Sequence, residues 1–185
     1  MKKGKLIVIS APSGCGKTTL VERLLERNKN LMRSISYTTR PSRAGEINGR
    51  DYFFISRDEF LEKKKKNFFL ESAEVFGQHY GTSRDSVADH TRRGKNVVLA
   101  IDVQGMKQLK QKAGQDLSVT SIFIMPPSEE ILRSRLENRK TETKEEIAKR
   151  LEVAREEMRA KSLYDFVVVN NEVDEAVQSI EEVIQ

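Results

Sequence analysis

The feature that most constrains the fold lies in residues 5–18, where an apolar run, a glycine-rich turn and a helical pattern follow one another. The run Lys5–Ser10 (KLIVIS) is short and rich in β-branched residues, as is typical of a buried strand. The turn Ala11–Thr18 (APSGCGKT) fits the pattern G-x-x-x-x-G-K-[ST], except that Ala11 stands at the first glycine. From Lys17 onward, apolar residues recur at helical spacing. A strand that enters such a turn and continues as a helix predicts the start of an α/β fold.

The glycine-rich turn has the chemistry of a phosphate-binding loop. Small residues let several backbone N–H groups point at one anion, and the following helix directs its positive end to the same place. In this pattern Lys17 reaches the β- and γ-phosphates of a nucleoside triphosphate, and Thr18 holds Mg²⁺. A dinucleotide fold is disfavoured because Thr19 stands where G-x-G-x-x-G needs its last glycine. We therefore expect triphosphate binding by Ala11, Pro12, Ser13, Gly14, Cys15, Gly16, Lys17, Thr18 and Thr19.

Cys15, the one cysteine of the chain, lies within this loop. A helix N-terminus and Lys17 nearby would lower the pKa of its thiol, and alkylation would then inactivate the protein unless ATP protected it. The alternative is an ordinary small loop residue. A single cysteine excludes an intramolecular disulfide and suits a reducing compartment, so we expect a cytoplasmic protein.

Three further apolar runs predict core strands, namely Val97–Val103, Val119–Met125 and Phe166–Val169. A helical pattern over Gln104–Ala113 fills one gap between them, and a long charged region fills another. Strands that alternate with helices in this way predict a parallel sheet with helices on both faces.

Two regions depart from this alternation. Residues 34–80 hold short strand-like pieces around one helix, whose start is marked by the capping-box pattern Ser56-Arg-Asp-Glu59. They predict a small β-rich insertion, with strands over Ser34–Thr38, Tyr52–Ile55 and Phe68–Ser72. Residues 128–161 are charged and helical, with a second capping box at Thr143-Lys-Glu-Glu146 and a break near Lys140–Thr143. A charged helical hairpin of this kind predicts a movable lid.

The composition narrows the class of partner. The chain has 185 residues, a formal charge of +5 and 33% charged residues, which favours an anionic partner. Nucleic acid is disfavoured because only 6% of residues are aromatic, Trp is absent and no zinc-finger spacing occurs. The apolar runs are too short for a signal peptide or a membrane span. We expect small phosphorylated substrates, with neither a nucleic-acid nor a membrane partner, in a monomer or a homo-oligomer.

A phosphate-binding loop alone leaves ATPases, GTPases, motors and kinases open. The guanine-reading motif N-K-x-D of GTPases is absent from the sequence. A kinase needs a second pocket for its acceptor, and residues 36–54 supply a candidate because Arg40 and Arg43 lie three residues apart with tyrosines nearby. The planar guanidinium group suits a phosphate. The alternative is a solvated basic loop.

At this point the sequence strongly resembles guanylate kinase. Residues 38–54 fit that family's signature throughout, and further blocks follow in the family's order over essentially the whole chain. These blocks are Glu71, Gly77–Ser83, Ile101–Gly105, Arg135-Leu136, Lys149–Leu151 and Val168–Asn170. The resemblance implies one guanylate-kinase-like domain over 1–185, with a core of about 1–33, 84–127 and 162–185. It further implies a GMP-binding insertion of about 34–83 and a lid of about 128–161.

The resemblance also implies the reaction and its residues. The activity would be phosphorylation of GMP, and of dGMP, by ATP in purine nucleotide metabolism. The GMP phosphate would be held by Arg40, Arg43, Tyr52 and Tyr80. Glu71 would accept hydrogen bonds from the guanine ring N–H and amine, and Ser36, Thr82 and Asp102 would complete the base pocket.

On the donor side, the resemblance assigns the clamping of ATP and of the transferred group to Arg135, Arg139 and Arg150. Asn170 resembles the family's adenine-side asparagine, although it could equally be the N-cap of the last helix. Mg²⁺ would lie on Thr18 and, in its outer shell, on Asp102. Two positions depart from the family pattern, because Ala100 and Asn171 stand where acids are common.

Three alternatives remain beside an ATP:GMP phosphotransferase. A non-catalytic guanylate-kinase-like module would bind phosphorylated proteins, but it predicts a degraded phosphate loop. An enzyme acting on another monophosphate, such as AMP or UMP, is the nearest catalytic alternative. Nucleic-acid binding through the basic surface would appear as affinity that falls steeply with salt.

Overall fold

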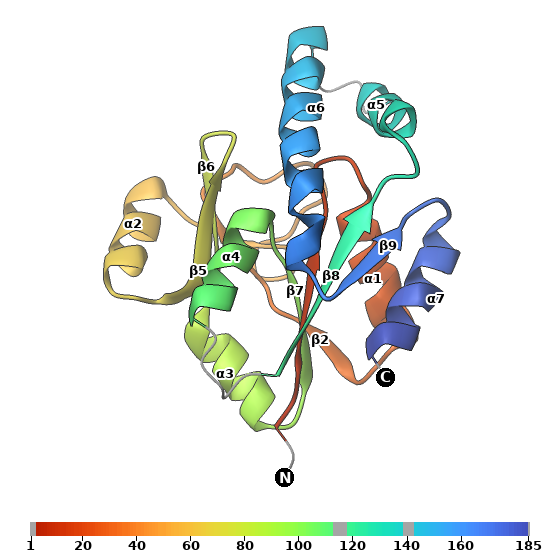
Figure 1. The fold of residues 1–185 in the computed structure, drawn as a ribbon. Coiled ribbons are helices and arrows are strands. Elements are labelled where there is room, and N and C mark those ends of the chain that lie inside the picture. The colour runs from red at the N-terminus through yellow and green to blue at the C-terminus, as the bar shows by residue number, and fades with distance from the viewer. Residues whose placement is uncertain (1–2, 113–117, 139–142, 185) are drawn as a thin grey trace. The chain divides into compact units, whose positions relative to one another are not determined.

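The computed structural model describes residues 3–112, 118–138 and 143–184, which form nine strands, seven α-helices and one short 3₁₀ helix (Figure 1). The strands are β1 Leu6–Ser10, β2 Leu31–Arg33, β3 Tyr37–Thr38, β4 Phe53–Phe54, β5 Phe69–Val75, β6 Gln78–Ser83, β7 Asn96–Ala100, β8 Val119–Met125 and β9 Phe166–Val169. The helices are α1 Lys17–Arg27, α2 Arg57–Lys65, α3 Arg84–Arg92, α4 Val103–Lys112, α5 Glu129–Glu137, α6 Lys144–Arg159, the 3₁₀ helix Ala160–Leu163 and α7 Val173–Ile184.

The strands form two sheets, and the α/β fold expected from the sequence is confirmed. The five-stranded sheet has the order β2-β7-β1-β8-β9, in which β2 pairs in parallel with β7 and β8 in parallel with β9. The four-stranded sheet has the order β4-β3-β6-β5, with β6 antiparallel to both β3 and β5. The second sheet is the β-rich insertion that the sequence predicted.

The chain divides into two compact units, each of which is described by itself. The first unit comprises Met1–Leu6, Asn30–Leu99 and Gln104–Ser118. Its interior includes the fully buried ring of Phe60, which stacks on Phe69 with 4.4 Å between ring centroids and on His79 with 5.2 Å. This aromatic stack packs α2 against β5 and β6.

The second unit comprises Ile7–Lys29, Ala100–Val103 and Val119–Gln185. Its core is formed by fully buried side chains of β1, α1 and β8, such as Ile9, Leu24 and Phe123. Helix α7 buries Val177 and Ile180 on one face and lies beside α1 (Figure 1). The strand–loop–helix start predicted from residues 5–18 is confirmed as β1, a glycine-rich loop and α1.

Several local predictions need correction. Strand β7 ends at Ala100 and Val103 already begins α4, so the apolar run Val97–Val103 is only partly a strand. Strand β5 continues to Val75, beyond the predicted Ser72, and the sequence did not predict strands β2 and β6 or helix α3. The strand patterns of β2 and β6 are weak in the sequence, because β2 is three residues long and β6 carries a glycine and several polar residues.

The two predicted capping boxes differ in outcome. At α6 the box is complete, because Thr143 accepts from the Glu146 N–H and the Glu146 carboxylate accepts from the Thr143 N–H. At α2 the Ser56 hydroxyl accepts from the Glu59 N–H, but the Glu59 carboxylate pairs with Lys63 at 3.4 Å instead. Helices α5 and α6, which the sequence predicts to form a lid, lie side by side (Figure 1). The predicted break near residues 140–143 falls largely outside the described residues.

Candidate active site

The glycine-rich loop between β1 and α1 has the backbone of a phosphate-binding loop. Gly14 and Gly16 have φ angles of 96° and 78°, in the left-handed region that disfavours other residues. A Cβ atom on Gly16 would also lie 2.9 Å from the Asn170 side-chain nitrogen, and one on Gly14 would lie 2.9 Å from the Leu132 side chain. Both glycines are therefore required by conformation and by packing behind the loop. Ala11, which replaces the first glycine of the pattern, is buried and introduces no positive φ.

The cations expected at the triphosphate lie around this loop in the second unit. The Lys17 ammonium group donates to the carbonyl of Ile101 at 3.0 Å, which draws it toward the end of β7. Arg150 of α6 donates to the Ser13 hydroxyl at 2.9 Å. Thr18 and Thr19 are exposed residues in the first turn of α1.

Asn170, at the end of β9, is almost completely buried and joins three parts of the second unit. Its side-chain amide donates to the Cys15 carbonyl at 2.8 Å, and its backbone N–H donates to Met125 of β8 at 2.8 Å. Its own carbonyl accepts from Arg135 of α5 at 3.1 Å. The N-cap alternative for Asn170 was wrong, because α7 begins only at Val173.

Arg135 is positioned by the loop that follows β9. One terminal nitrogen of its guanidinium group donates to the carbonyls of Asn170 and Asn171, at 3.1 and 3.3 Å. The other terminal nitrogen is buried and has no hydrogen-bond partner among the described residues. An anion beside this nitrogen would complete the side chain's hydrogen bonds.

Sequence reasoning missed Glu157, which lies on α6 seven residues after Arg150. Burial raises the pKa of its carboxyl group to about 7, although the charge of Lys17 and a hydrogen bond from the Ser13 backbone oppose the shift. Two residues seven apart lie on one face of a helix, so Arg150 and Glu157 both face the phosphate-binding loop. That heptad spacing was visible in the sequence.

Cys15 has no solvent-exposed surface, and its main chain is fixed within the loop. The prediction of a reactive thiol required access for an alkylating reagent. The burial of Cys15 therefore favours the alternative, a small residue that packs inside the loop.

In the first unit, two threonine hydroxyls fix the backbone at Arg40. The Thr38 hydroxyl donates to the His79 carbonyl at 3.0 Å and accepts from the Arg40 N–H at 3.1 Å. The neighbouring Thr39 hydroxyl accepts from the His79 N–H at 2.9 Å. These bonds tie the segment after β3 to β6, so the arginine begins from a fixed backbone.

Arg40 lies in a cluster with aromatic and acidic side chains. Its guanidinium group donates to both Glu46 carboxylate oxygens, at 2.8 and 3.0 Å, and interacts with the Tyr80 hydroxyl. It also lies 5.5 Å from the ring centre of Tyr52. Burial acts to raise the pKa of Glu46, but hydrogen bonds from Arg40 and from the Arg43 backbone hold it below its ordinary value. Glu46 is therefore a carboxylate that orients Arg40.

Tyr52 stands at the centre of this cluster. Burial raises the pKa of its phenol, so the hydroxyl remains a hydrogen-bond donor at neutral pH. Its ring centroid is 6.1 Å from that of Tyr80 and 5.8 Å from the Arg33 guanidinium carbon. The structure thus brings Arg40, Tyr52 and Tyr80 together and adds Arg33, which sequence reasoning did not include.

Glu71 of β5 is a buried acid, with a relative exposure of 3%. The hydroxyl of Thr82, directly opposite it on β6, donates to one of its carboxylate oxygens at 2.5 Å. The predicted base-pocket residues Glu71 and Thr82 therefore meet across the sheet.

The remaining candidates differ in their surroundings. Arg43 has an exposed side chain, and its backbone N–H donates to Glu46 at 2.7 Å. The Ser36 carbonyl accepts from the Phe53 N–H, which fixes β4. Asp102 follows β7 within the second unit and is half-buried, and Arg139 lies outside the described residues.

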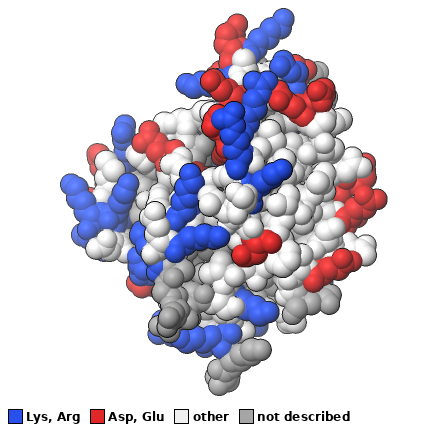
Figure 2. All heavy atoms as spheres, viewed as in Figure 1, with Lys and Arg blue, Asp and Glu red and all other residues white. Residues whose placement is uncertain are grey.

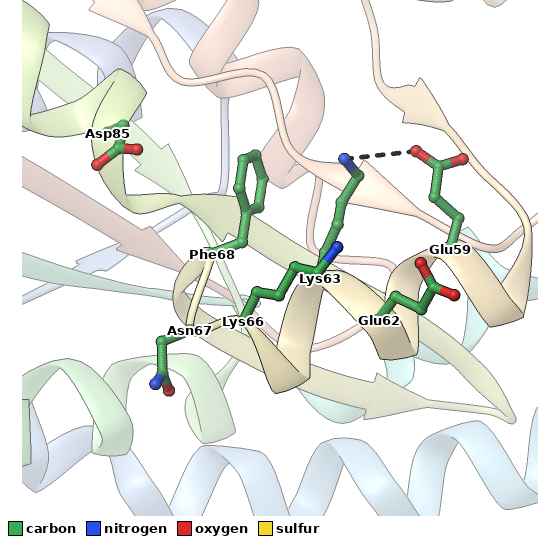
Figure 3. Close-up of a pocket in the computed structure, with 7 residues that line it drawn as sticks. All are labelled: Glu59, Glu62, Lys63, Lys66, Asn67, Phe68 and Asp85. Carbon is green, nitrogen blue, oxygen red and sulfur yellow. Dashed lines mark ion pairs between the residues drawn. The ribbon is translucent and has the colours of Figure 1, made fainter.

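A surface pocket in the first unit contains none of the predicted site residues (Figure 3). Its lining mixes acids and lysines, with Lys63 paired to Glu59 at 3.4 Å and placed over the Phe68 ring. The charges of its lining residues nearly cancel, which gives it no preference for an anion. The lining residues are Glu59, Glu62, Lys63, Lys66, Asn67, Phe68 and Asp85.

Comparisons with known proteins identify the family of this chain. A guanylate kinase family model matches residues 3–185. The chain is 46% identical to a guanylate kinase of Caldanaerobacter subterraneus subsp. tengcongensis over 183 residues, covering 99% of this chain and 87% of the relative. A guanylate kinase of Clostridium tetani is also 46% identical, over 100% of this chain and 86% of its own. The crystal structure of guanylate kinase from Anaplasma phagocytophilum matches with a TM-score of 0.82 and 35% identity, over 100% of this chain and 86% of that one. The chain belongs to the guanylate kinase family.

Proposed function

We propose that this chain transfers the γ-phosphoryl group of ATP to GMP, and to dGMP, yielding GDP or dGDP and ADP. The observation that carries the acceptor assignment is the buried Glu71 carboxylate held by Thr82. The guanine ring N–H and its amine form an adjacent donor pair that a carboxylate can accept, whereas adenine lacks this pair.

In this proposal, the GMP phosphate binds at the cluster of Arg40, Tyr52 and Tyr80, with Arg43 reaching it from the exposed loop. Arg40 would exchange part of its pairing with Glu46 for the phosphate, and the Tyr52 hydroxyl would donate to it. Charge-assisted hydrogen bonds of this kind contribute about 1.5–3 kcal/mol each. Ser36 and Asp102 are proposed to complete the base pocket.

On the donor side, we propose that the triphosphate binds the loop Ala11–Thr19 and Lys17. Arg135 would contribute its buried unpaired nitrogen, and Arg150 would move from Ser13 to the phosphates. Arg139 is retained as a third candidate cation from the sequence. Because the acceptor oxygen of GMP is already anionic at neutral pH, no general base is needed, and catalysis consists of alignment and charge neutralisation.

We propose that Mg²⁺ binds here mainly through the substrate phosphates and water, with few protein ligands. The described residues include no group of three or more His, Cys, Asp or Glu side chains that could hold a metal. Mg²⁺ usually takes one or two protein oxygens together with substrate phosphates and water. The exposed Thr18 hydroxyl and Asp102 would supply those oxygens, and the bound ion would neutralise charge on the triphosphate.

The placement of the activity in the cell is also a proposal. The only cysteine is an unbridged thiol, Cys15, which suits the reducing cytoplasm. None of the helices within the described residues is both long and apolar enough to cross a bilayer.

We propose that the 34–83 segment binds the acceptor and that 128–161 acts as the lid of a single catalytic domain.

The test is ADP release with ATP and Mg²⁺ and each of GMP, dGMP, AMP, UMP and CMP as acceptor. We expect turnover with the two guanine nucleotides and background rates with the others. Turnover of AMP or UMP instead would contradict the guanine assignment. GMP binding without turnover would favour a non-catalytic binding module.

Two variants separate the proposed roles. Lys17→Met should abolish turnover and leave the GMP dissociation constant within about twofold, because Lys17 acts on the donor phosphates. Glu71→Gln should weaken GMP selectively, and an unchanged preference for GMP over AMP would contradict the guanine-reading role of Glu71.

A further inference from the structure

Strand β5, which carries Glu71, is the last strand of its sheet in the order β4-β3-β6-β5. One edge of β5 pairs with β6, and no other strand of the described residues pairs with its second edge. Side chains of helix α4, from the same unit, take up this second edge. The position of Glu71 therefore depends on both neighbours of its strand.

Three α4 side chains, spaced four residues apart, bond three β5 carbonyls spaced two residues apart. The Gln104 amide donates to Glu74 at 3.0 Å, the Gln108 amide donates to Ser72 at 2.5 Å, and the Lys112 ammonium donates to Leu70 at 3.3 Å. The Gln108 carbonyl oxygen also accepts from the Ser72 N–H at 3.1 Å, so Gln108 bonds both main-chain groups of one residue.

The spacing of this ladder follows from regular geometry. Four residues of an α-helix rise about 6.0 Å, and two residues of an antiparallel strand rise about 6.8 Å. The two repeats stay nearly in register over the two steps between three contacts, so one helix face can bond one strand edge. Gln104, Gln108 and Lys112 all lie on that face.

A β-bulge next to the ladder places Glu71 opposite Thr82. Phe69 pairs with Ser83, but the next pair is Glu71 with Thr82, so Leu70 is an extra residue in β5. If Leu70 were instead paired regularly, it would stand opposite Thr82, and Glu71 would stand opposite Gly81, which has no side chain to hold a carboxylate. The carbonyl of the extra residue Leu70 is the one that Lys112 bonds, and Arg84 bonds the preceding carbonyl of Phe69 at 3.3 Å.

From these contacts we infer that Gln108 and Lys112 are positioning residues for guanine recognition: they hold the bulged strand that sets the Glu71 carboxylate. Gln108 fixes the residue after Glu71, and Lys112 fixes the residue before it. Neither side chain touches the nucleotide in this scheme. The inference rests on the proposed guanine-reading role of Glu71.

Inosine monophosphate distinguishes positioning from general stability, because it lacks only the guanine amine. The quantity to measure is the ratio of kcat/KM for GMP to kcat/KM for IMP. Since a displacement of about 1 Å can cost up to about 100-fold in rate, we expect Gln108→Met and Lys112→Met to lower this ratio about fivefold to tenfold. The KM for ATP should stay within about twofold, because the bonds that these substitutions remove are made to β5.

Gln111→Met is the matched control, because Gln111 is exposed on the same helix and the substitution is identical. Its ratio should equal that of the unmodified protein. If Gln108→Met does not fold, which circular dichroism would reveal, Lys112→Met still tests the inference, because Lys112 is an exposed residue.

The outcomes separate this inference from the proposed function. If the Gln108 and Lys112 variants lose activity equally with GMP and IMP, their role is structural only and the inference is overturned. If Glu71→Gln changes the ratio and the α4 variants do not, guanine reading by Glu71 stands and the positioning role is wrong. If Glu71→Gln leaves the ratio unchanged, the guanine-reading role itself is wrong.

Discussion

Single residues in the second unit connect the phosphate-binding loop to its surroundings, and Asn170 is the clearest case. Its amide holds the Cys15 carbonyl, and its own carbonyl holds Arg135. The same amide nitrogen lies where a side chain on Gly16 would have to be. Asn170 thus sets the loop and an adjacent arginine relative to one another, whether or not it also contacts adenine as the family resemblance implies.

The first prediction follows from the Cys15 bond. Asn170→Ala leaves the buried Cys15 carbonyl without its donor, at a cost of about 1–3 kcal/mol, and lets the loop shift. We expect kcat/KM for ATP to fall about 10- to 100-fold with the KM for GMP unchanged. Steady-state kinetics with ATP and with GTP as donor checks this, since a pure loop effect lowers both equally. A selective loss with ATP would indicate an adenine contact, and Asn171→Ala is the matched control because that side chain is exposed.

The second prediction concerns Glu157 and pH. Burial raises the pKa of its carboxyl group in the folded protein from 4.5 to about 7. The folded protein therefore keeps this proton at pH values where the unfolded chain has lost it. The resulting stabilisation is complete below pH 4.5 and is lost as the pH rises through 7.

Glu157→Gln removes this titration and keeps the shape of the side chain. Above pH 7 the variant should be more stable than the unmodified protein by about 3 kcal/mol, and the difference should vanish in acid. Urea unfolding across the pH range measures this. A constant difference at every pH would show that Glu157 does not titrate between the two values.

At the scale of elements, the lid helices have their own stabilising contacts. The capping box at Thr143 satisfies two backbone donors at the start of α6. Farther along, the Arg155 guanidinium group forms a paired interaction with the Glu129 carboxylate at the start of α5. The contact between Arg155 and Glu129 links the two helices.

The third prediction is that Thr143→Ala frays the first turn of α6 at a cost of about 1 kcal/mol. Thr143→Ser keeps the hydroxyl and should restore most of the loss. Hydrogen exchange of the amides of Glu146 and Ile147 is the direct measurement, because these N–H groups are bonded to Thr143. Equal exchange rates in the alanine and serine variants would show that the cap does not contribute.

At the scale of the whole molecule, charge is unevenly divided between the two units. The first unit has 19 of the 33 Lys and Arg residues and 10 of the 28 Asp and Glu residues, a formal charge of +9. The second unit has the other 14 and 18, a formal charge of −4. Lysines and arginines are prominent over α2 and α4 of the first unit, whereas α5 and α6 show both signs (Figure 2). The unit with the proposed acceptor site is the positive one.

The fourth prediction is that the KM for GMP rises with salt. Positive charge around the acceptor site attracts the dianionic phosphate, and screening shortens its range from about 10 Å at 0.1 M to about 3 Å at 1 M. We expect a several-fold increase in the KM for GMP over that range. Titration with potassium chloride at saturating ATP measures it. A KM that did not change would show that local contacts alone bind the phosphate.

Much of this protein was determined by the sequence over short distances. The glycine-rich turn and the α6 capping box depend on neighbouring residues, and the structure confirms both predictions. Residues 38–54 carried the family resemblance, with which the family model agrees. The turn and the capping box can be predicted from the sequence because their interacting atoms belong to residues only a few positions apart.

Only the tertiary structure decided the contacts between distant segments. The Asn170 amide reaches Cys15 across 155 positions, and Gln108 reaches Ser72 across 36. The bulge at Leu70 lies where β5 pairs with β6 on one side and accepts a hydrogen bond from Lys112 of α4 on the other. No local preference of Leu70 encodes an extra residue there, since its energy depends on partners that folding brings together. For the same reason, the resemblance could assign Glu71 and Thr82 to the base pocket, but only the tertiary structure decided that Glu71 is buried and bonded to Thr82.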